Sequence, residues 1–542
     1  MRGRRTRRGM GPVALAGILL AGLFVAAPQA RATIRYEVSL AQPAQHVFHV
    51  TMMIPNVKES VIVQMSAWDA LYQIRDFAHH VTDFHASGSA ANSPHVTRVD
   101  KETWRVDLQG AQGAPSEIRL EYAAYWDEAG PFGTELNAQH AFLNLAMVLC
   151  YVPNRRSEGT LVHFSDVPSG WNIAVELPQS AASQGGEQGG YTARNYDDLV
   201  DAPVEIGKFD TLRFQAGGRP IRVVIHGDAQ DHARMTDMVS RIVNYETRLM
   251  GEAPFPEYTF LYHVGRGFGG GGMEHSNSTA IAVQNSDELP DVTAHEFFHL
   301  WNVKRIRPQS LEPVDRTREM WTRSLWFAEG VTDTYATYTL VRSGLWDTTQ
   351  YLEDMSTQIT ELESRPARAW QSVEESSLNA WFEKYPLYNE PDFSISYYNK
   401  GQLLGVALDI TIRDATDNRA SLDDVLRRLN EKYAHAGRFY PESAGIREAA
   451  EEVIGAANGG TQVDLTGFFD DYVAGTKEIP FADLLGRAGL QLVEHGRTRA
   501  GTPTYVVEQL AHPTERQARI LNGLLQGATT GPIPAASGTL PE

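Results

Sequence analysis

The sequence predicts a multidomain protein, in which a β-rich, sandwich-like N-terminal domain precedes an α+β, mainly helical domain. Three observations lead to this fold class. The chain has 542 residues, and a single hydrophobic core rarely extends beyond roughly 250–300 residues. Short alternating runs of apolar and polar residues recur from residue 33 to about 215. Helical periodicity replaces them from about 228 onward.

Composition narrows the class of protein. Hydrophobic residues make up 42% of the chain and charged residues 21%, with a formal net charge of −19. This balance excludes a collagen, a disulfide-dense miniprotein and a wholly disordered chain. We expect no nucleic-acid partner, because nucleic acids are bound by basic surfaces. The single cysteine, Cys150, cannot form an intrachain disulfide.

The first 32 residues have the pattern of a secretory signal peptide. Five arginines stand within the first eight residues, an apolar run occupies 13–27, and residues 30–32 form a small-x-small cleavage site. The apolar run is shorter than the ~20 residues that cross a bilayer, so an uncleaved anchor is the weaker interpretation. We therefore expect an exported protein, periplasmic or secreted, without stable membrane insertion after cleavage. Loss of this segment, which has six arginines and no acidic residue, changes the charge to −25.

Residues 33–227 form the expected β-rich N-terminal domain. Its strand candidates are separated by turn-rich stretches at 86–94 and 183–190. Several short strands with turns at this spacing are typical of an antiparallel sandwich. The candidates are 34–40, 46–53, 60–65, 103–108, 118–125, 171–177 and 211–215.

Residues 228–490 form the expected second domain. A helix candidate at 228–250 precedes two strand candidates, 258–264 and 278–283, which flank a glycine-rich loop at 265–272. Strands that lead into a helical body are typical of an α+β arrangement. Residues 491–542 are a C-terminal extension, which we expect to be disordered from about 527 because Gly, Pro, Ala and Thr dominate there. Further helix candidates are 288–302, 319–343, 347–363, 396–415, 421–434 and 442–457.

A metal-binding pattern stands in the first of these later helices, at His295-Glu296-Phe297-Phe298-His299. Residues four apart lie on the same face of a helix, so both imidazoles can bind one zinc ion at about 2.0–2.1 Å. Glu296 stands beside them, where it can take a proton from a metal-bound water. The alternative is that the two histidines are ordinary core or surface residues.

A catalytic zinc site needs a third protein ligand. The best candidate is Glu329, on the next helix candidate, because it is flanked by apolar residues and a carboxylate in that setting needs a strong partner. Asp333 lies four residues later on the same helix face. It is a candidate carboxylate partner for the second ring nitrogen of His295. As an alternative, Asp333 is an ordinary acid on the helix surface.

The motifs together resemble the glycyl aminopeptidase family of gluzincin zinc metallopeptidases. The resemblance rests on residues 295–308, His-Glu-Phe-Phe-His-Leu-Trp-Asn-Val-Lys-Arg-Ile-Arg-Pro, and on 325–333, Leu-Trp-Phe-Ala-Glu-Gly-Val-Thr-Asp. Residues 271–279, Gly-Gly-Met-Glu-His-Ser-Asn-Ser-Thr, resemble the family's glycine-rich segment. Stretches at 68–86 and 196–203 resemble parts of its N-terminal domain.

The resemblance implies a thermolysin-like catalytic domain with one zinc ion per chain. It also implies an aminopeptidase that removes small N-terminal residues, glycine or alanine, from peptides with a free N-terminus. Many members carry a C-terminal PDZ domain, and we expect none here, because the about 50 residues after Val493 are too few for such a domain plus the tail.

Two further roles come from relatives of the aminopeptidase N type. Tyr398, in Tyr397-Tyr398-Asn399-Lys400-Gly401, resembles the tyrosine whose hydroxyl meets the oxyanion, with Tyr397 as the alternative. Glu274 resembles the glutamate that binds the substrate's α-ammonium group, a task suited to a charge-assisted hydrogen bond.

Three weaker assignments remain. Gly271 and Gly272 allow close approach of the backbone to an extended peptide, and no Lys-Ser/Thr follows that would make this a phosphate loop. Arg305 and Arg307 follow the metal motif and can bind substrate or structural acids, so they receive no catalytic role.

The alternatives for the whole protein are a zinc endopeptidase on the same scaffold and a catalytically silent peptide-binding protein.

Overall fold

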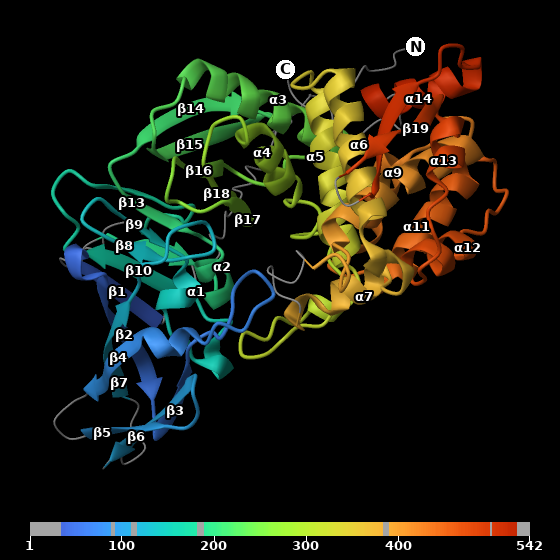
Figure 1. Cartoon of the computed structure of the whole chain (residues 1–542). Coiled ribbons are helices and arrows are strands. Elements are labelled where there is room, and N and C mark those ends of the chain that lie inside the picture. Colours follow the sequence, from blue (N-terminus) through green and yellow to red (C-terminus); the bar gives the residue numbers. More distant parts are fainter. Residues whose placement is uncertain are drawn as a thin grey trace, which may run out of the picture. The chain divides into compact units, whose positions relative to one another are not determined.

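The computed structural model describes residues 34–87, 93–109, 116–180, 189–382, 390–498 and 501–527. All of these residues belong to one compact unit (Figure 1). The expected signal segment and the expected disordered tail lie outside the described residues. The fold class predicted from the sequence is confirmed, since strands dominate up to residue 283 and helices dominate from residue 289.

The N-terminal part is built on a six-stranded sheet. Residues alternate between buried and half-exposed along its first strand, which is why Ile34, Tyr36 and Val38 face the core. The strand order is β12-β10-β1-β2-β7-β4, and a separate three-stranded sheet has the order β3-β6-β5. The bounds are β1 Ile34–Gln42, β2 Val47–Val57, β3 Ser60–Gln64, β4 Val81–Ser87, β5 Ser93–Arg98, β6 Thr103–Gln109, β7 Ser116–Tyr125, β10 Thr160–Ser165 and β12 Tyr191–Ala193.

Two further sheets connect this part to the helical part. One has the order β11-β13-β9-β8 and the other the order β14-β15-β16-β18-β17. A small apolar cluster that includes Phe142, Val224 and Leu261 joins strands of the two sheets. The bounds are β8 Glu135–Leu136, β9 His140–Leu143, β11 Asn172–Ala174, β13 Val204–Gly207, β14 Asp210–Ala216, β15 Arg219–Gly227, β16 Tyr258–Val264, β17 Gly271–Glu274 and β18 Ser278–Val283.

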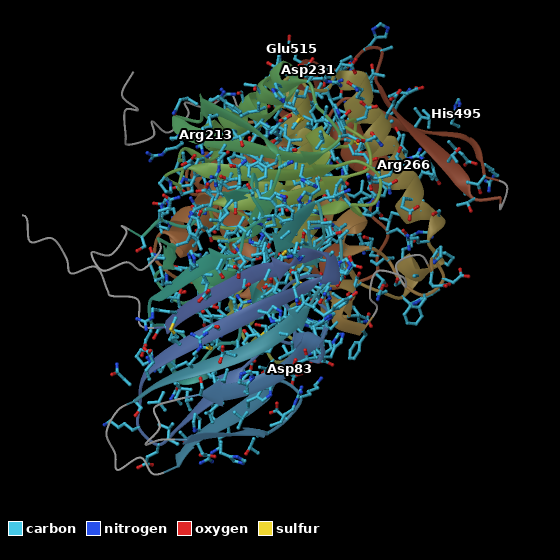
Figure 2. The ribbon with its side chains drawn as sticks, turned by 90° about the vertical axis from the view of Figure 1, so that its left-hand side faces the viewer. Asp83, Arg213, Asp231, Arg266, His495 and Glu515 are labelled. Atoms are coloured by element: carbon cyan, nitrogen blue, oxygen red, sulfur yellow. The ribbon has the colours of Figure 1, made fainter. Side chains whose placement is uncertain are left out.

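The second of these sheets spans the domain boundary that the sequence predicts at residue 228. β14 and β15 precede that position, yet β15 pairs in parallel with β16 along seven residue pairs. The two expected domains therefore share a sheet, and the exact boundary stays a prediction. Figure 2 shows Arg213 on β14 and, at the start of the following helix, Asp231.

Most helices follow β18 and enclose the second core, whereas α3 lies between β15 and β16. Asp231 caps α3 by accepting hydrogen bonds from the backbone N–H groups of Ala233 and Arg234. The helix bounds are α1 Leu145–Val148, α2 Tyr196–Val200, α3 His232–Met250, α4 Leu289–Phe298, α5 Val331–Arg342, α6 Thr348–Ser364, α7 Val373–Leu378, α9 Tyr397–Ala415, α10 Leu422–Leu429, α11 Glu442–Ala457, α12 Thr466–Phe468, α13 Phe481–Arg487 and α14 Glu515–Gln526. Single π-helical turns occupy Trp326–Gly330, Asn430–Ala434 and Phe469–Val473.

Three helices differ from their predicted bounds. The helix predicted at 228–250 begins only at His232, after its cap Asp231. The helix predicted at 288–302 ends at Phe298, and tight turns follow in which Leu300 and Trp301 donate to carbonyls only three residues back. The helix predicted at 319–343 begins only at Trp326. The hydroxyls of Thr322 and Ser324 bind the carboxylate of Glu442 instead, which holds that segment as a loop.

The C-terminal extension contains a β-hairpin, β19 Leu490–Arg497 and β20 Pro503–Gln509, and then α14. The hairpin packs against α6, where the Ser356 hydroxyl accepts from the backbone N–H of Val507. Among the residues that the structure describes, no helix is long and apolar enough to cross a membrane.

Candidate active site

The two histidines of the metal-binding pattern converge on one point, as the helical spacing predicts. Their Nε2 atoms lie 2.9 Å apart, and Glu329 Oε2 lies 3.6 Å from His295 Nε2 and 3.3 Å from His299 Nε2. Two ligands bound to zinc at 2.0–2.1 Å under a tetrahedral angle are about 3.3 Å apart. The three distances lie around that value, so the residues are arranged as a ligand set.

The remaining ring nitrogens of both histidines have acceptors. His295 Nδ1 lies 2.6 Å from Asp333 Oδ1, and His299 Nδ1 lies 2.7 Å from the carbonyl oxygen of Asn302. Each Nδ1–H donates in these contacts, which leaves the Nε2 lone pair for a metal. Two facing lone pairs and a carboxylate make a site that suits a cation.

Glu329 occupies the π-helical turn Trp326–Gly330, and it is buried. Burial favours the neutral acid, but His299 and His295 hold the pKa of Glu329 well below its usual range. The hydroxyl of Tyr72, from the N-terminal part, donates to Glu329 Oε1 at 3.2 Å. The carboxylate is therefore oriented by groups from both parts of the chain.

A close approach between two helices positions this turn. A side chain on Gly401 of α9 would overlap the carbonyl of Trp326, and a side chain on Gly330 would overlap α9 in return. The absence of side chains at both positions lets α9 lie directly against the turn that carries Glu329. The same helix begins with Tyr397 and Tyr398.

Glu296 lies beside the ligand set, with a carboxylate oxygen within 4.8 Å of a ring nitrogen of each histidine. Its side chain is buried, and within the described ranges its Oε2 atom has no hydrogen-bond partner. Burial raises the pKa of Glu296 to about 7, against the lowering effect of the two imidazoles. A buried carboxyl with a free oxygen and a pKa in this range is suited to accept and return a proton.

Strand β17 lies over Glu296. Any side chain on Gly272 would overlap the carboxyl carbon of Glu296, and a side chain on Gly271 would meet the ring of Phe132 at 3.3 Å. Gly272 thus lets the backbone of this edge strand lie directly against the carboxyl group of Glu296, and Gly271 lets it lie against Phe132. Glu274 ends the same strand and lines the same cavity.

A half-buried aspartate, Asp201, holds the turn after β17. Asp201 accepts from Lys304 Nζ at 2.7 Å and from the backbone N–H of Ser276 at 3.0 Å, and it contacts His275 Nδ1 at 3.4 Å. Burial opposes ionisation of Asp201, but Lys304 and His275 hold its pKa well below the usual range. The turn that follows Glu274 is therefore tied to both parts of the chain.

The two adjacent tyrosines have different surroundings. Tyr398 lines the cavity, with its ring centroid 6.3 Å from that of His295. Tyr397 is buried and stacks against Tyr398 at 4.7 Å between ring centroids. Of the two candidates for contact with an oxyanion, Tyr398 is thus the one at the cavity.

The cavity itself has a volume of about 660 Å³. It contains the ligand set, Glu296, Glu274 and Tyr398, and residues of the N-terminal part form much of its wall. These wall residues include Trp68, Asp69, Tyr72, Phe132, Arg156 and Asp197.

The two arginines after the metal motif have structural partners. Arg305 donates to the carbonyl oxygens of Leu300 and Pro254. Arg307 pairs with Glu312 at 2.7 Å.

Three contributing residues were not predicted as site residues from the sequence. Asn302 could have been found, because a histidine ligand needs an acceptor and the chain turns back just after His299. Tyr72 and Asp201 stand in the stretches at 68–86 and 196–203 that resemble the family, but no local pattern assigns them a contact with the site.

Two models of one family match the chain. The M61 glycyl aminopeptidase model matches residues 288–404, and the peptidase M61 N-terminal domain model matches residues 35–208. Among solved structures, an aminopeptidase N family protein from Idiomarina loihiensis is 26% identical with a TM-score of 0.79, over 88% of this chain and 82% of that chain. An M1 zinc metallopeptidase from Deinococcus radiodurans is 15% identical with a TM-score of 0.47, over 79% of this chain and 92% of that chain. None of the curated proteins matches.

The fold, the clustered candidate ligands and the two family-model matches define the class: the protein is a metallopeptidase. Within that class, the chain belongs to the M61 glycyl aminopeptidase family. The family resemblance predicted from the sequence motifs is thereby confirmed.

Proposed function

We propose that this protein is an exported zinc aminopeptidase that releases small N-terminal residues, glycine or alanine, from peptides. The observation that carries the proposal is the presence of Glu274 in the same cavity as Glu296 and the ligand set. A carboxylate there can bind a free α-ammonium group by a charge-assisted hydrogen bond. The preference for small residues rests on the description of the matching family.

The ligand residues fit one zinc ion. His295 and His299 would hold it through Nε2, and Glu329 would hold it through a carboxylate oxygen. A set of two imidazoles and one carboxylate favours zinc over calcium or magnesium. When bound, zinc supplies a Lewis acid that polarises the scissile carbonyl and makes a water molecule more acidic.

The side chains of the protein then carry the proton transfers and the binding. Glu296 accepts a proton from the attacking water and delivers it to the leaving amine. The Tyr398 hydroxyl donates a hydrogen bond to the developing oxyanion. Asp333 and the Asn302 carbonyl hold the two imidazoles in the tautomer that leaves Nε2 free.

Substrates with and without a free amine test this proposal. We expect Gly- and Ala-anilides to be hydrolysed and their N-acetylated forms to be resistant. In Glu274→Gln, kcat/KM for free-amine substrates should fall by roughly 10- to 150-fold, the equivalent of a hydrogen bond to a charged group. Glu319→Gln, an exposed position outside the cavity wall, is the matched control.

The opposite pattern would favour the zinc endopeptidase. In that case blocked peptides are cleaved internally, and Glu274→Gln leaves the hydrolysis of free-amine substrates unchanged. A protein that binds zinc and hydrolyses neither kind of peptide would be the silent binding protein. Export is tested separately, by N-terminal sequencing of the protein recovered from the periplasm or the medium.

A further inference from the structure

A phenylalanine of the N-terminal part lines the cavity without belonging to a hydrophobic core. Phe132 is half-buried, whereas its neighbours Pro131 and Gly133 are buried. Among the residues that the structure describes, Phe132 belongs to none of the hydrophobic clusters. We propose that Phe132 determines specificity on the leaving-group side of the site, where it selects substrates whose second residue has an apolar side chain. This proposal rests on the proposed aminopeptidase function.

The loop that carries Phe132 is held at three successive carbonyl groups. The side-chain amide of Asn144, which is buried, donates to the carbonyl oxygens of Pro131 at 2.9 Å and Gly133 at 2.6 Å. Arg75 Nη1 donates to the carbonyl oxygen of Phe132 itself at 2.6 Å. Because the backbone is held on both sides of Phe132, the loop presents its ring at the cavity before a substrate binds. A contact that is already in place costs little ordering on binding, as a specificity-determining side chain requires.

The position of Phe132 beside β17 identifies the substrate residue that it meets. Gly272 lies against the carboxyl group of Glu296, the proposed proton acceptor, and therefore marks the scissile bond. Gly271 stands one residue farther from Glu274 along the strand, and a side chain there would meet the ring of Phe132 at 3.3 Å. Seen from the carboxylate that binds the α-ammonium group, Phe132 thus lies beyond the scissile bond.

The dimensions of a peptide agree with this order. The three residue steps from Gly271 to Glu274 extend over about 10 Å in a strand. One residue of an extended substrate covers at most ~3.3–3.6 Å, so a chain bound at Glu274 has passed its first residue before it reaches Phe132. The cavity volume of about 660 Å³ falls within the ~300–1,000 Å³ of sites that hold drug-sized ligands. The cavity therefore has room for residues beyond a first glycine or alanine.

The surroundings of the ring favour an apolar side chain at this place. Gly271 and Gly272 add no side chains of their own, so the ring of Phe132 is an apolar surface beside a bare strand. A leucine side chain that packs on the ring leaves water, which is favourable in proportion to the apolar area covered. A phenylalanine side chain also gains the preferred geometry of paired rings. A glycine in the second position of the substrate makes neither contact.

A limit on the size of the first residue is the competing explanation. In that case the ring of Phe132 would fill the space beside Glu274 and exclude first side chains larger than that of alanine. The two explanations differ in which residue of the substrate responds when the ring is removed.

Dipeptide amides that share alanine as the first residue and differ in the second test the proposal. We expect wild-type kcat/KM to be about 10-fold higher for Ala-Leu-amide than for Ala-Gly-amide, the lower end of what an apolar contact adds to discrimination. This preference should disappear in Phe132→Ala and in Phe132→Gln, and Phe132→Leu should retain it. Phe439→Ala, at an exposed phenylalanine outside the cavity wall, is the matched control and should also retain it.

The ratio of the two kcat/KM values decides the outcome, because damage to the fold would lower both values alike. A wild type without the preference overturns the proposal, and so does a Phe132→Ala or Phe132→Gln protein that keeps it. The polar variant gives the result if the alanine variant does not fold. Hydrolysis of Leu-Gly-amide that appears only in Phe132→Ala would overturn the proposal in favour of a limit on the first residue.

Failure of this proposal and failure of the proposed function give different results. Hydrolysis of both amides without a preference leaves the aminopeptidase intact and removes only the role of Phe132. A wild type that hydrolyses no free-amine substrate contradicts the proposed function, and the role of Phe132 with it.

Discussion

At the scale of single residues, the site depends as much on glycines, which have no side chain, as on residues with functional groups. Glu296 is buried, its Oε2 atom has no partner among the described residues, and the backbone of Gly272 lies against its carboxyl group. The strand thus limits where the carboxyl group can point. The orientation of Glu296 therefore depends on Gly272, a residue that has no functional group of its own.

Gly272→Ala should therefore impair catalysis although it leaves every reactive group in place. The new methyl group would displace Glu296 or β17, and a displacement of about 1 Å can cost roughly 10²-fold in rate. Steady-state hydrolysis of Ala-anilide measures the effect. Gly270→Ala is the control, since a side chain there meets no atom within 4 Å. Equal activity in both variants would show that the strand does not orient Glu296.

Glu296→Gln removes the proton acceptor but keeps the shape of the side chain. We expect kcat to fall by about 10²–10⁴-fold, the usual contribution of a general base. Zinc content should stay as in the wild type, because Glu296 is not a ligand in the proposed set. A variant with full activity would contradict the proposed proton transfer.

At the scale of helices and strands, the catalytic part depends on the contact between α9 and the turn before α5. Gly401 and Gly330 let the two backbones approach closely, which sets Glu329 toward the histidines and Tyr398 at the cavity. The contact thereby positions the proposed metal ligand Glu329 and the candidate oxyanion donor Tyr398 together.

Gly401→Ala should destabilise the protein by about 1–3 kcal/mol, the usual cost of excess volume in a packed core. Activity should fall with it, because the turn that carries Glu329 must move. Thermal unfolding and zinc content give the two readouts. Gly486→Ala in α13, where the added carbon has open space, should be neutral or slightly stabilising.

The sequence predicts the elements better than their contacts. The helix predicted at 347–363 is α6, Thr348–Ser364, and the one predicted at 442–457 has the observed bounds of α11. The periodicity of apolar residues indicates which face of an element is buried, and it was sufficient to predict α6 and α11. It does not report a π-helical turn at Trp326–Gly330, because that turn depends on how α9 packs against it.

The same limit applies to the site. A spacing of four residues brings His295 and His299 together within one helix, so the sequence predicts their contact. Tyr72 and Asp201 lie 257 and 103 positions before their partners Glu329 and Lys304. These contacts depend on how the two parts of the chain pack together, which no local pattern contains.

At the scale of the whole molecule, the N-terminal part completes the site of the helical part. Tyr72 donates to Glu329, the proposed metal ligand, and Asp201 holds the turn beyond Glu274 through Lys304 and Ser276. The cavity wall likewise comes from both parts. The stability of the contact between the N-terminal part and the helical part should therefore influence the peptidase activity.

Asp201→Asn should weaken this contact in a pH-dependent way. The pKa of Asp201 lies below that of an unfolded aspartate, about 3.9. Its ion pair therefore stabilises the fold above about pH 4, and this stabilisation is lost as the pH falls further. We expect the variant to lose about 2 kcal/mol of unfolding free energy at neutral pH. The difference from the wild type should shrink below about pH 4.

Denaturant unfolding of metal-stripped proteins at several pH values measures this difference without a contribution from metal release. Asp210→Asn is the control, since that carboxylate is more than half exposed. A difference between Asp201→Asn and the wild type that stays constant down to about pH 2 would contradict the assignment of the low pKa to Asp201.

The hydrogen bond from Tyr72 to Glu329 joins residues 257 positions apart, and this separation has a consequence in time. A ribosome produces Tyr72 long before Glu329, so the strands of the N-terminal part can fold while the proposed metal ligands are not yet made. The cavity wall needs residues of both parts, so it is complete only after synthesis has passed Tyr398 on α9.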